Sequence, residues 1–266
     1  MEVISNHFYK LGLSKNKSSS FLNDPSCVIM FSGGVDSVAV LKRLLVTRDE
    51  KIYAHHIHLK NNEGINNLKR YKGESKALRK IVPYMKRTFR DFHYSESTID
   101  VRQITDIIPS YYTEEDLHLS RLSFIPDQIY YSVIGGILAK LSNSDTVYTG
   151  TCIEDYTGSL RRRQHTIDNI TVSSAYPKIV HTQRPHDHLS KKQNIEYLGE
   201  ELMNLVWYCR HPIKKNGKLL SCNTNLGMLA PSIDLETDEI FKCRSCRVVS
   251  DSLIEIEEEQ RGIKYA

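Results

Sequence analysis

A glycine-rich loop at the boundary between a strand and a helix constrains this chain more than any other stretch. Residues 27–45 read CVIMFSGGVDSVAVLKRLL: a short apolar run, then SGGVDS at residues 32–37, then apolar residues at helical spacing. An uninterrupted apolar run of this length is typical of a strand that is buried on both faces of a parallel sheet. The sequence therefore predicts a buried strand that turns into a helix through two adjacent glycines and one carboxylate.

The loop has two interpretations, an ordinary tight turn and an anion-binding site. The first N–H groups of a helix lack intrahelical partners, and the helix dipole places partial positive charge there. Gly33 and Gly34 allow positive φ and the close approach of an anion, and the hydroxyls of Ser32 and Ser37 are further donors. The carboxylate of Asp36 would repel phosphate, and a Mg²⁺ ion bound between the two explains its presence. We favour the anion site over the turn.

Strand-like and helix-like segments alternate through the first part of the chain. We predict strands at residues 27–31, 51–59, 91–101 and 145–148, and helices around residues 38–45, 71–85 and 129–141. Alternation of this kind predicts an α/β fold, a Rossmann-like parallel sheet with helices on both faces.

The second part of the chain has a different character. Ser190 and Gln193 form a capping box that predicts another helix start, and the sequence after Trp207 becomes loop-like. A last helix is expected to end before the acidic run at 257–259. We divide the chain into a polar lead-in (1–26), an α/β domain (27–206) and a small cysteine-rich lobe with a C-terminal helix (207–266).

Net charge and the lack of targeting patterns indicate where the protein acts and what kind of partner it binds. The formal charge of +4 suits an anionic small molecule and is too low to indicate nucleic-acid binding. The sequence shows no signal-peptide pattern and no run of about 18 apolar residues, so we expect a cytoplasmic protein without a membrane partner. Its thiols are then expected to be reduced, with Cys27 and Cys152 as small core or site-lining residues.

Four cysteines gather in the C-terminal lobe. Cys243 and Cys246 form a C-x-x-C pair, and Cys209 and Cys222 supply two more thiols. Four thiolates are the ligand set of a structural Zn²⁺ site, which we prefer to scattered structural thiols. A redox pair is the weaker alternative, because this C-x-x-C is not expected to open a helix after a strand.

Six of the eleven histidines form two groups, which we interpret as structural or solvent-facing residues; a second metal site in the later group is the weaker alternative. Three of them, within residues 55–58, fall in a predicted strand with no acidic residue expected nearby. Three more, within residues 181–188, fall in a polar loop that contains proline and are expected to face solvent.

The SGGVDS loop contains neither G-x-x-x-x-G-K-S/T nor G-x-G-x-x-G. It closely resembles the S-G-G-x-D-S loop of the PP-loop (N-type) ATP pyrophosphatases, whose fold is adenine nucleotide alpha hydrolase-like. The resemblance implies ATP and Mg²⁺ as cofactors, cleavage between the α and β phosphates, and adenylation of a substrate oxygen that a nitrogen or sulfur nucleophile then attacks. It implies nucleotide binding by Ser32, Gly33, Gly34, Val35, Asp36, Ser37 and Gly150, with Asp36 and Ser37 as the catalytic residues.

Later segments resemble, in order, the 7-cyano-7-deazaguanine synthases of that family. Residues 149–158, TGTCIEDYTG, resemble Gly-x-Asn-x-x-Asp-Tyr-Ser-Gly, and residues 189–193, LSKKQ, resemble Leu-x-Lys-x-x-Ile. Residues 207–209, WYC, resemble a Trp-Ser-Cys that precedes the C-x-x-C. The resemblance implies a deazapurine substrate, 7-carboxy-7-deazaguanine, which is adenylated, converted by ammonia to the amide, and adenylated again to give the nitrile.

Four residues are candidate substrate contacts. Asp155 and Tyr156 match the family segment, although a structural Asp turn would have the same sequence. Arg161 and Arg163, within an Arg-Arg-Arg run, could grip pyrophosphate, a carboxylate or a nucleic-acid backbone, or belong to a solvated basic loop.

The chain departs from the synthases in segments that would shape the base pocket. GSLRRRQ at residues 158–164 replaces a Tyr-Pro-Asp-Cys-Arg run, PDQ at residues 126–128 replaces Pro-x-Arg-Asn, and an insertion separates Cys222 from Cys243. We predict a divergent, AMP-forming ligase that adenylates a carboxylate and forms a C–N bond, with an amide or a nitrile as product and ammonia or another amine as donor.

Three alternatives to this prediction stay open. The enzyme could attach a deazaguanine to a protein amine, or it could modify RNA, for example by thiolation. It could also be a non-catalytic ATP-binding module, against which the intact Ser32, Asp36 and Ser37 argue. A homodimer and a protein or nucleic-acid acceptor are the further partners that we consider.

Overall fold

The structure, a computed structural model, describes most of the predicted α/β domain and parts of the C-terminal lobe. The described residues are 26–60, 67–100, 127–155, 168–173, 180–209, 213–215, 218–220, 232–233, 240–241 and 244–262.

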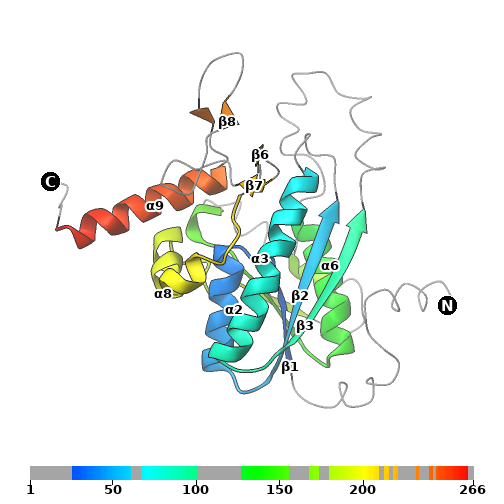
Figure 1. The fold of residues 1–266 in the computed structure, drawn as a ribbon. Helices are drawn as coiled ribbons and strands as arrows, with labels where there is room; N and C mark the ends of the chain where they lie inside the picture. Colours follow the sequence, from blue (N-terminus) through cyan, green and yellow to red (C-terminus); the bar gives the residue numbers. More distant parts are fainter. Residues whose placement is uncertain are drawn as a thin grey trace.

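A parallel sheet of five strands forms the centre of the fold (Figure 1). The strands are β1 (Ser26–Met30), β2 (Lys51–Lys60), β3 (His93–Asp100), β4 (Thr146–Thr149) and β5 (His181–Gln183). Their order is β3-β2-β1-β4-β5, and every neighbouring pair is parallel. The four predicted strands are confirmed. The fifth strand, β5, corrects the expectation of a polar loop at His181. The strand has only three residues, the first and last of which are exposed, so its sequence shows no apolar alternation.

Helices cover both faces of this sheet, which confirms the predicted fold class. The helices α2 (Val35–Thr47), α3 (Asn67–Thr88) and α8 (Lys191–Met203) supply buried residues to one hydrophobic cluster, and α6 (Asp127–Leu141) supplies them to the other. Side chains of β1 alternate between the two clusters: Ile29 belongs to the first, and Val28 and Met30 belong to the second. A strand with apolar residues on both sides is the pattern expected for the centre of a parallel sheet.

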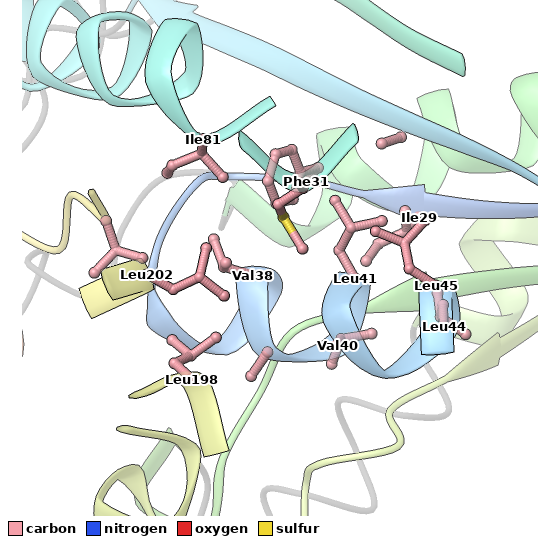
Figure 2. Packing of buried hydrophobic residues seen from close by; sticks show 14 of the residues in the cluster. Ile29, Phe31, Val38, Val40, Leu41, Leu44, Leu45, Ile81, Leu198 and Leu202 are labelled. Carbon is pink, nitrogen blue, oxygen red and sulfur yellow. The ribbon is translucent and has the colours of Figure 1, made fainter. Parts of the chain in front are cut away.

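The larger cluster fixes α2, the helix that follows the glycine loop. Val38 and Leu41 of α2 lie among Ile29 of β1, Ile81 of α3 and Leu198 of α8 in one packed group (Figure 2). The start of α2 is thereby held between the sheet and two other helices, so the preceding loop has little freedom to move.

The C-terminal lobe contains more regular structure than its sequence indicates. The described residues include two short antiparallel pairs, β6 (Ile213–Lys215) with β7 (Lys218–Leu220) and β8 (Ser232–Ile233) with β9 (Ile240–Phe241). These strands have two or three residues each, too few for a recognisable alternation.

The C-terminal helix α9 (Arg244–Gln260) runs through the acidic residues at which we expected it to end. Its start lies shortly after β9, and Cys246 lies in its first turn, so the expectation that no helix begins at this motif after a strand was wrong. Cys243 lies outside the described residues. Lys192 of α8 forms an ion pair with Glu259 of α9, and Val249 of α9 belongs to the larger core cluster. In Figure 1 the two helices lie side by side.

None of the helices described here combines the length and the apolar character that crossing a membrane requires.

Truncation of Leu41 tests the packing that holds α2. Its side chain is fully buried, so Leu41→Ala is expected to lower the free energy of unfolding by about 2–5 kcal/mol, through lost burial and the cavity left behind. Val46, on the same helix, is 61% exposed, and Val46→Ala should change the same quantity by less than about 0.5 kcal/mol. Denaturant unfolding of both variants measures the difference, and equal effects would contradict this packing.

Candidate active site

The glycine loop connects the end of β1 to the start of α2, and the helix has no side-chain cap. Gly33 has φ +77°, a conformation that favours glycine, and Gly34 is the N-cap residue of α2. No side chain caps this helix, so its first N–H groups have no side-chain acceptor, as expected at an anion site. This geometry supports the anion-binding interpretation over the ordinary turn.

Two serines brace the loop from inside. The hydroxyls of Ser32 and Ser37 lie 2.9 Å apart, and the Ser37 hydroxyl also donates to the carbonyl of Gly34 at 3.1 Å. The N–H of Gly34 donates to the Ser32 hydroxyl at 3.3 Å. Both hydroxyls thus hold the shape of the loop in this structure.

Gly150 lies directly against the loop, where its lack of a side chain is required. A Cβ at this position would lie 2.3 Å from the backbone nitrogen of Ser37 and 2.6 Å from the carbonyl carbon of Asp36. Backbone atoms cannot give way as a flexible side chain can. The parallel pairing of β4 with β1 brings Gly150 to this position, since Thr149 pairs with Met30.

The segment that leads into the lobe holds the other side of the loop. The N–H of Trp207 donates to the carbonyl of Gly33 at 3.2 Å, and the Trp207 indole N–H donates to the carbonyl of Cys209 at 2.9 Å. A Cβ on Gly73 of α3 would lie 2.3 Å from the indole, so this glycine makes room for the ring.

Asp36, in the first turn of α2, contacts two residues from the first turns of α8. One of its oxygens, Oδ2, accepts a hydrogen bond from the ammonium of Lys191 in an ion pair. The other, Oδ1, accepts from the Asn194 side-chain amide at 2.9 Å. The Asn194 oxygen in turn lies 2.8 Å from Nδ1 of His186, which donates to it.

Sequence analysis missed three of these four residues. Lys191 lies in the segment that resembles Leu-x-Lys-x-x-Ile, so that resemblance could have identified it. Asn194 had no signal of its own. The expectation that His186 faces solvent was wrong, because this side chain is 2% exposed and packs edge-on against Tyr197.

Burial and neighbouring charged or polar groups shift the pKa values of three side chains at this site. Burial lowers the pKa of Lys191, but Asp36, Cys152 and Asp155 together outweigh it, so the pKa is raised and the amine stays an ammonium. Burial lowers the pKa of His186 despite its hydrogen bond to Asn194, which favours the neutral imidazole. Burial and then Asp36 raise the pKa of the Cys152 thiol, which favours the protonated form.

The turn after β4 places Cys152 and Asp155 beside Asp36. The backbone N–H of Cys152 donates to Asp155 at 2.9 Å, within the short helix η4 (Ile153–Asp155). The Glu154 carboxylate accepts from the N–H of Lys191 at 2.9 and 3.1 Å, where the helix dipole favours negative charge. The predicted substrate residue Asp155 is therefore beside the loop, and its contacts here are those of a structural Asp turn.

The residues around Asp36 fit the Mg²⁺ that the resemblance implies. Ligand atoms of Asp36, Cys152 and Asp155 all lie within 4.8 Å of one another. Carboxylate oxygens suit Mg²⁺, whereas a protonated thiol does not, so the two aspartates are the candidates to hold it. The uncapped start of α2 fits the phosphates of a nucleotide.

Other predicted site residues cannot be compared with the structure. Tyr156, Arg161, Arg163, Cys222 and Cys243 lie outside the described residues.

The two described thiols of the predicted zinc site are close together. Cys209 and Cys246 are buried in one small cluster with Trp207 and Tyr208. Zinc binding by four cysteines stays a prediction.

The histidines of β2 are structural in this fold, with one correction. His55 lies between the hydroxyls of Ser95 and Ser97 at 2.8 and 2.9 Å, and burial lowers its pKa to about 4. His58 pairs with Glu96 at 2.8 Å. The expectation of no nearby acidic residue was wrong, because Glu96 lies on β3, the strand paired with β2.

Comparison with known proteins gives distant structural similarities. No protein-family model matches the chain, and no curated protein matches it either. The U34-tRNA thiolase NcsA from Methanococcus maripaludis, solved with its 4Fe-4S cluster, is 14% identical with a TM-score of 0.42, over 96% of this chain and 80% of that chain. The NH3-dependent NAD synthetase from Campylobacter jejuni is 15% identical with a TM-score of 0.32, over 69% of this chain and 66% of that chain. At this distance the two similarities carry no argument about activity.

Substitution of Gly150 tests the close approach at the loop. Gly150→Ala is expected to lower the free energy of unfolding by about 1–3 kcal/mol, because its methyl group would overlap the backbone of Ser37. A matched control is Gly34→Ala, whose Cβ would have its nearest neighbour at 3.5 Å and whose φ of −82° suits alanine. The control should leave stability unchanged or raise it by up to about 1 kcal/mol. Two equally stable variants in a thermal or urea melt would contradict the contact.

Proposed function

We propose that the protein is an ATP-dependent, AMP-forming enzyme of the PP-loop type. The observation that supports this most is the uncapped start of α2, which carries Asp36 in its first turn and lies directly against Gly150. A polyphosphate bound there would meet backbone N–H groups, a helix dipole and the Lys191 ammonium in one place. The buried Asp36–Lys191 pair supports catalysis over a purely structural role, since such pairs add little stability for the cost of burying them.

The chemistry follows from where the charges lie. Residues 33–37 would hold the β and γ phosphates at the helix start, and Asp36 with Asp155 would hold Mg²⁺, which neutralises charge on the departing pyrophosphate. A substrate carboxylate oxygen then bonds to the α-phosphorus, and the bond from that phosphorus to the bridging oxygen breaks. An amine next bonds to the acyl carbon and loses a proton, and AMP leaves. The protein's main contribution is position and fixed charge, so no side-chain nucleophile is needed.

We further propose a 7-carboxy-7-deazapurine as the acceptor, with an amide or nitrile product. The segment resemblances at residues 149–158 and 189–193 support this, because described residues of both segments contact the loop region. Gly150 lies against the backbone of Ser37, and Lys191 pairs with Asp36. The same resemblance supports a structural Zn²⁺ held by Cys209, Cys222, Cys243 and Cys246.

A product assay tests the proposed function. The protein is incubated with ATP, Mg²⁺, ammonium and 7-carboxy-7-deazaguanine, and nucleotides and bases are separated by liquid chromatography and mass spectrometry. We expect AMP and pyrophosphate together with the amide or nitrile. Asp36→Asn should reduce AMP formation by at least about 100-fold, as expected for loss of a carboxylate that would hold the charge-neutralising Mg²⁺. Asp49→Asn, at an exposed position just past α2, is the matched control and should retain activity.

Different products would change the assignment. AMP formed only when a protein amine or an RNA is added would support the conjugating or RNA-modifying alternatives. ADP as the product, or ATP binding without turnover under any of these conditions, would contradict the proposal.

Metal analysis tests the zinc lobe separately. Protein purified without added metal is expected to carry about one Zn²⁺ per chain, and Cys246→Ser should lose it. Ser245→Ala, inside the same C-x-x-C, is the control that should retain the metal. A wild-type protein without zinc would refute the zinc proposal and leave the ATP chemistry untouched.

A further inference from the structure

The two oxygens of Asp36 have partners of different kinds. Oδ1 receives a hydrogen bond from Asn194, a neutral and fully buried amide that His186 holds from its other end. Oδ2 receives its hydrogen bond from the ammonium of Lys191. The first contact is part of a fixed chain of buried neutral groups, whereas the second is an ion pair with a side chain on a flexible four-carbon stem.

Lys191 occupies a position that suits a cation of any kind. Its side chain is only 11% exposed, and besides Asp36 the nearby groups that act on its charge include Cys152 and Asp155. These three residues are the described ones whose ligand atoms cluster tightly enough to hold a metal ion. An ammonium therefore lies where a divalent cation would otherwise bind, and the two positive charges compete for Oδ2.

An anion at the start of α2 would give this ammonium a second partner. Asp36 belongs to the first turn of that helix, so its carboxylate and the open N–H groups lie within the same turn. A bound polyphosphate would bring several negative charges next to Lys191 and offset the loss of its contact with Asp36.

We propose that Lys191 is an exchangeable counterion, which excludes divalent cations from Asp36 until a polyphosphate binds at α2 and takes over its ammonium. This inference rests on the proposed nucleotide site and adds an order of events to it. The His186–Asn194 pair is the positioning part of the device, because it holds Oδ1 while Oδ2 changes partner. The protein would then bind metal well only together with nucleotide.

Binding measurements on Lys191→Met test the exchange, because the variant should bind Mn²⁺ more tightly and ATP more weakly than wild type. Without nucleotide, Mn²⁺ binding is followed by electron paramagnetic resonance, and the variant should bind at least about tenfold tighter than wild type, because a competing positive charge is gone. With EDTA present, ATP binding is followed by calorimetry, and the same variant should bind at least about tenfold weaker. Lys192→Met, which removes the adjacent ammonium that pairs with Glu259, should leave both affinities within about twofold of wild type.

Two further measurements guard against a variant that fails to fold. Lys191→Gln keeps a donor for Asp36 without the charge and should show the same two signs. In the wild-type protein, sulfate serves as an anion for α2 that binds Mn²⁺ weakly, and saturating sulfate should tighten Mn²⁺ binding. Circular dichroism and the thermal midpoint report whether each variant is folded.

The outcomes separate this inference from the proposed function. Mn²⁺ binding that is unchanged or weaker in the folded variants and unchanged by sulfate would overturn the exchange and leave a permanent structural ion pair. A wild-type protein that binds no ATP, with or without Mg²⁺, would overturn the proposed function. The nucleotide-free Mn²⁺ comparison would still decide whether Lys191 competes with a cation.

Discussion

The contact between Asp36 and Lys191 joins the first turns of two helices that are far apart in the sequence, and the site depends on it. α2 and α8 begin at the same place because their apolar residues pack in one cluster, with Leu198 and Leu202 beside Val38 (Figure 2). The sheet supplies the remaining wall, since β4 runs parallel to β1 and ends at Gly150. A core built of ordinary aliphatic packing thus brings a carboxylate, an ammonium and an open helix N-terminus together.

Polar burial on this scale is expensive unless each group has a partner. Here the Asp36 oxygens are both hydrogen-bonded, Asn194 is bonded at both ends, and the N–H of Lys191 is bonded to Glu154. Apolar packing already holds α2 against α8, so this polar network is not needed to join the two helices. We interpret this network as fixed polar groups that would stabilise the charge of a bound ligand.

The fold could be predicted from the sequence largely because its signals are local. The buried strand predicted at residues 27–31, the glycine turn and the Ser190–Gln193 capping box each depend on neighbouring residues. The structure has a strand at Ser26–Met30, a positive φ at Gly33 and the capping box. β5 was missed because its three residues have no pattern, and α9 was cut short because exposed glutamates resemble a helix end as much as a helix surface. The partners of Asp36 follow only from tertiary contacts, so Asn194 and His186, some 150 residues away, had no signal that a sequence shows. Gly150 could be found through the resemblance, and its steric reason came from the pairing of β4 with β1.

The central claim is that the start of α2 binds pyrophosphate groups. The most direct measurement is a two-dimensional ¹⁵N–¹H NMR titration of the wild-type protein with inorganic pyrophosphate. The amides of Gly33, Gly34, Val35, Asp36 and Ser37 should shift most and saturate together, with the Lys191 amide following, because these groups surround the proposed anion. Shifts confined to other parts of the chain, or no saturable shift at residues 33–37, would contradict the account.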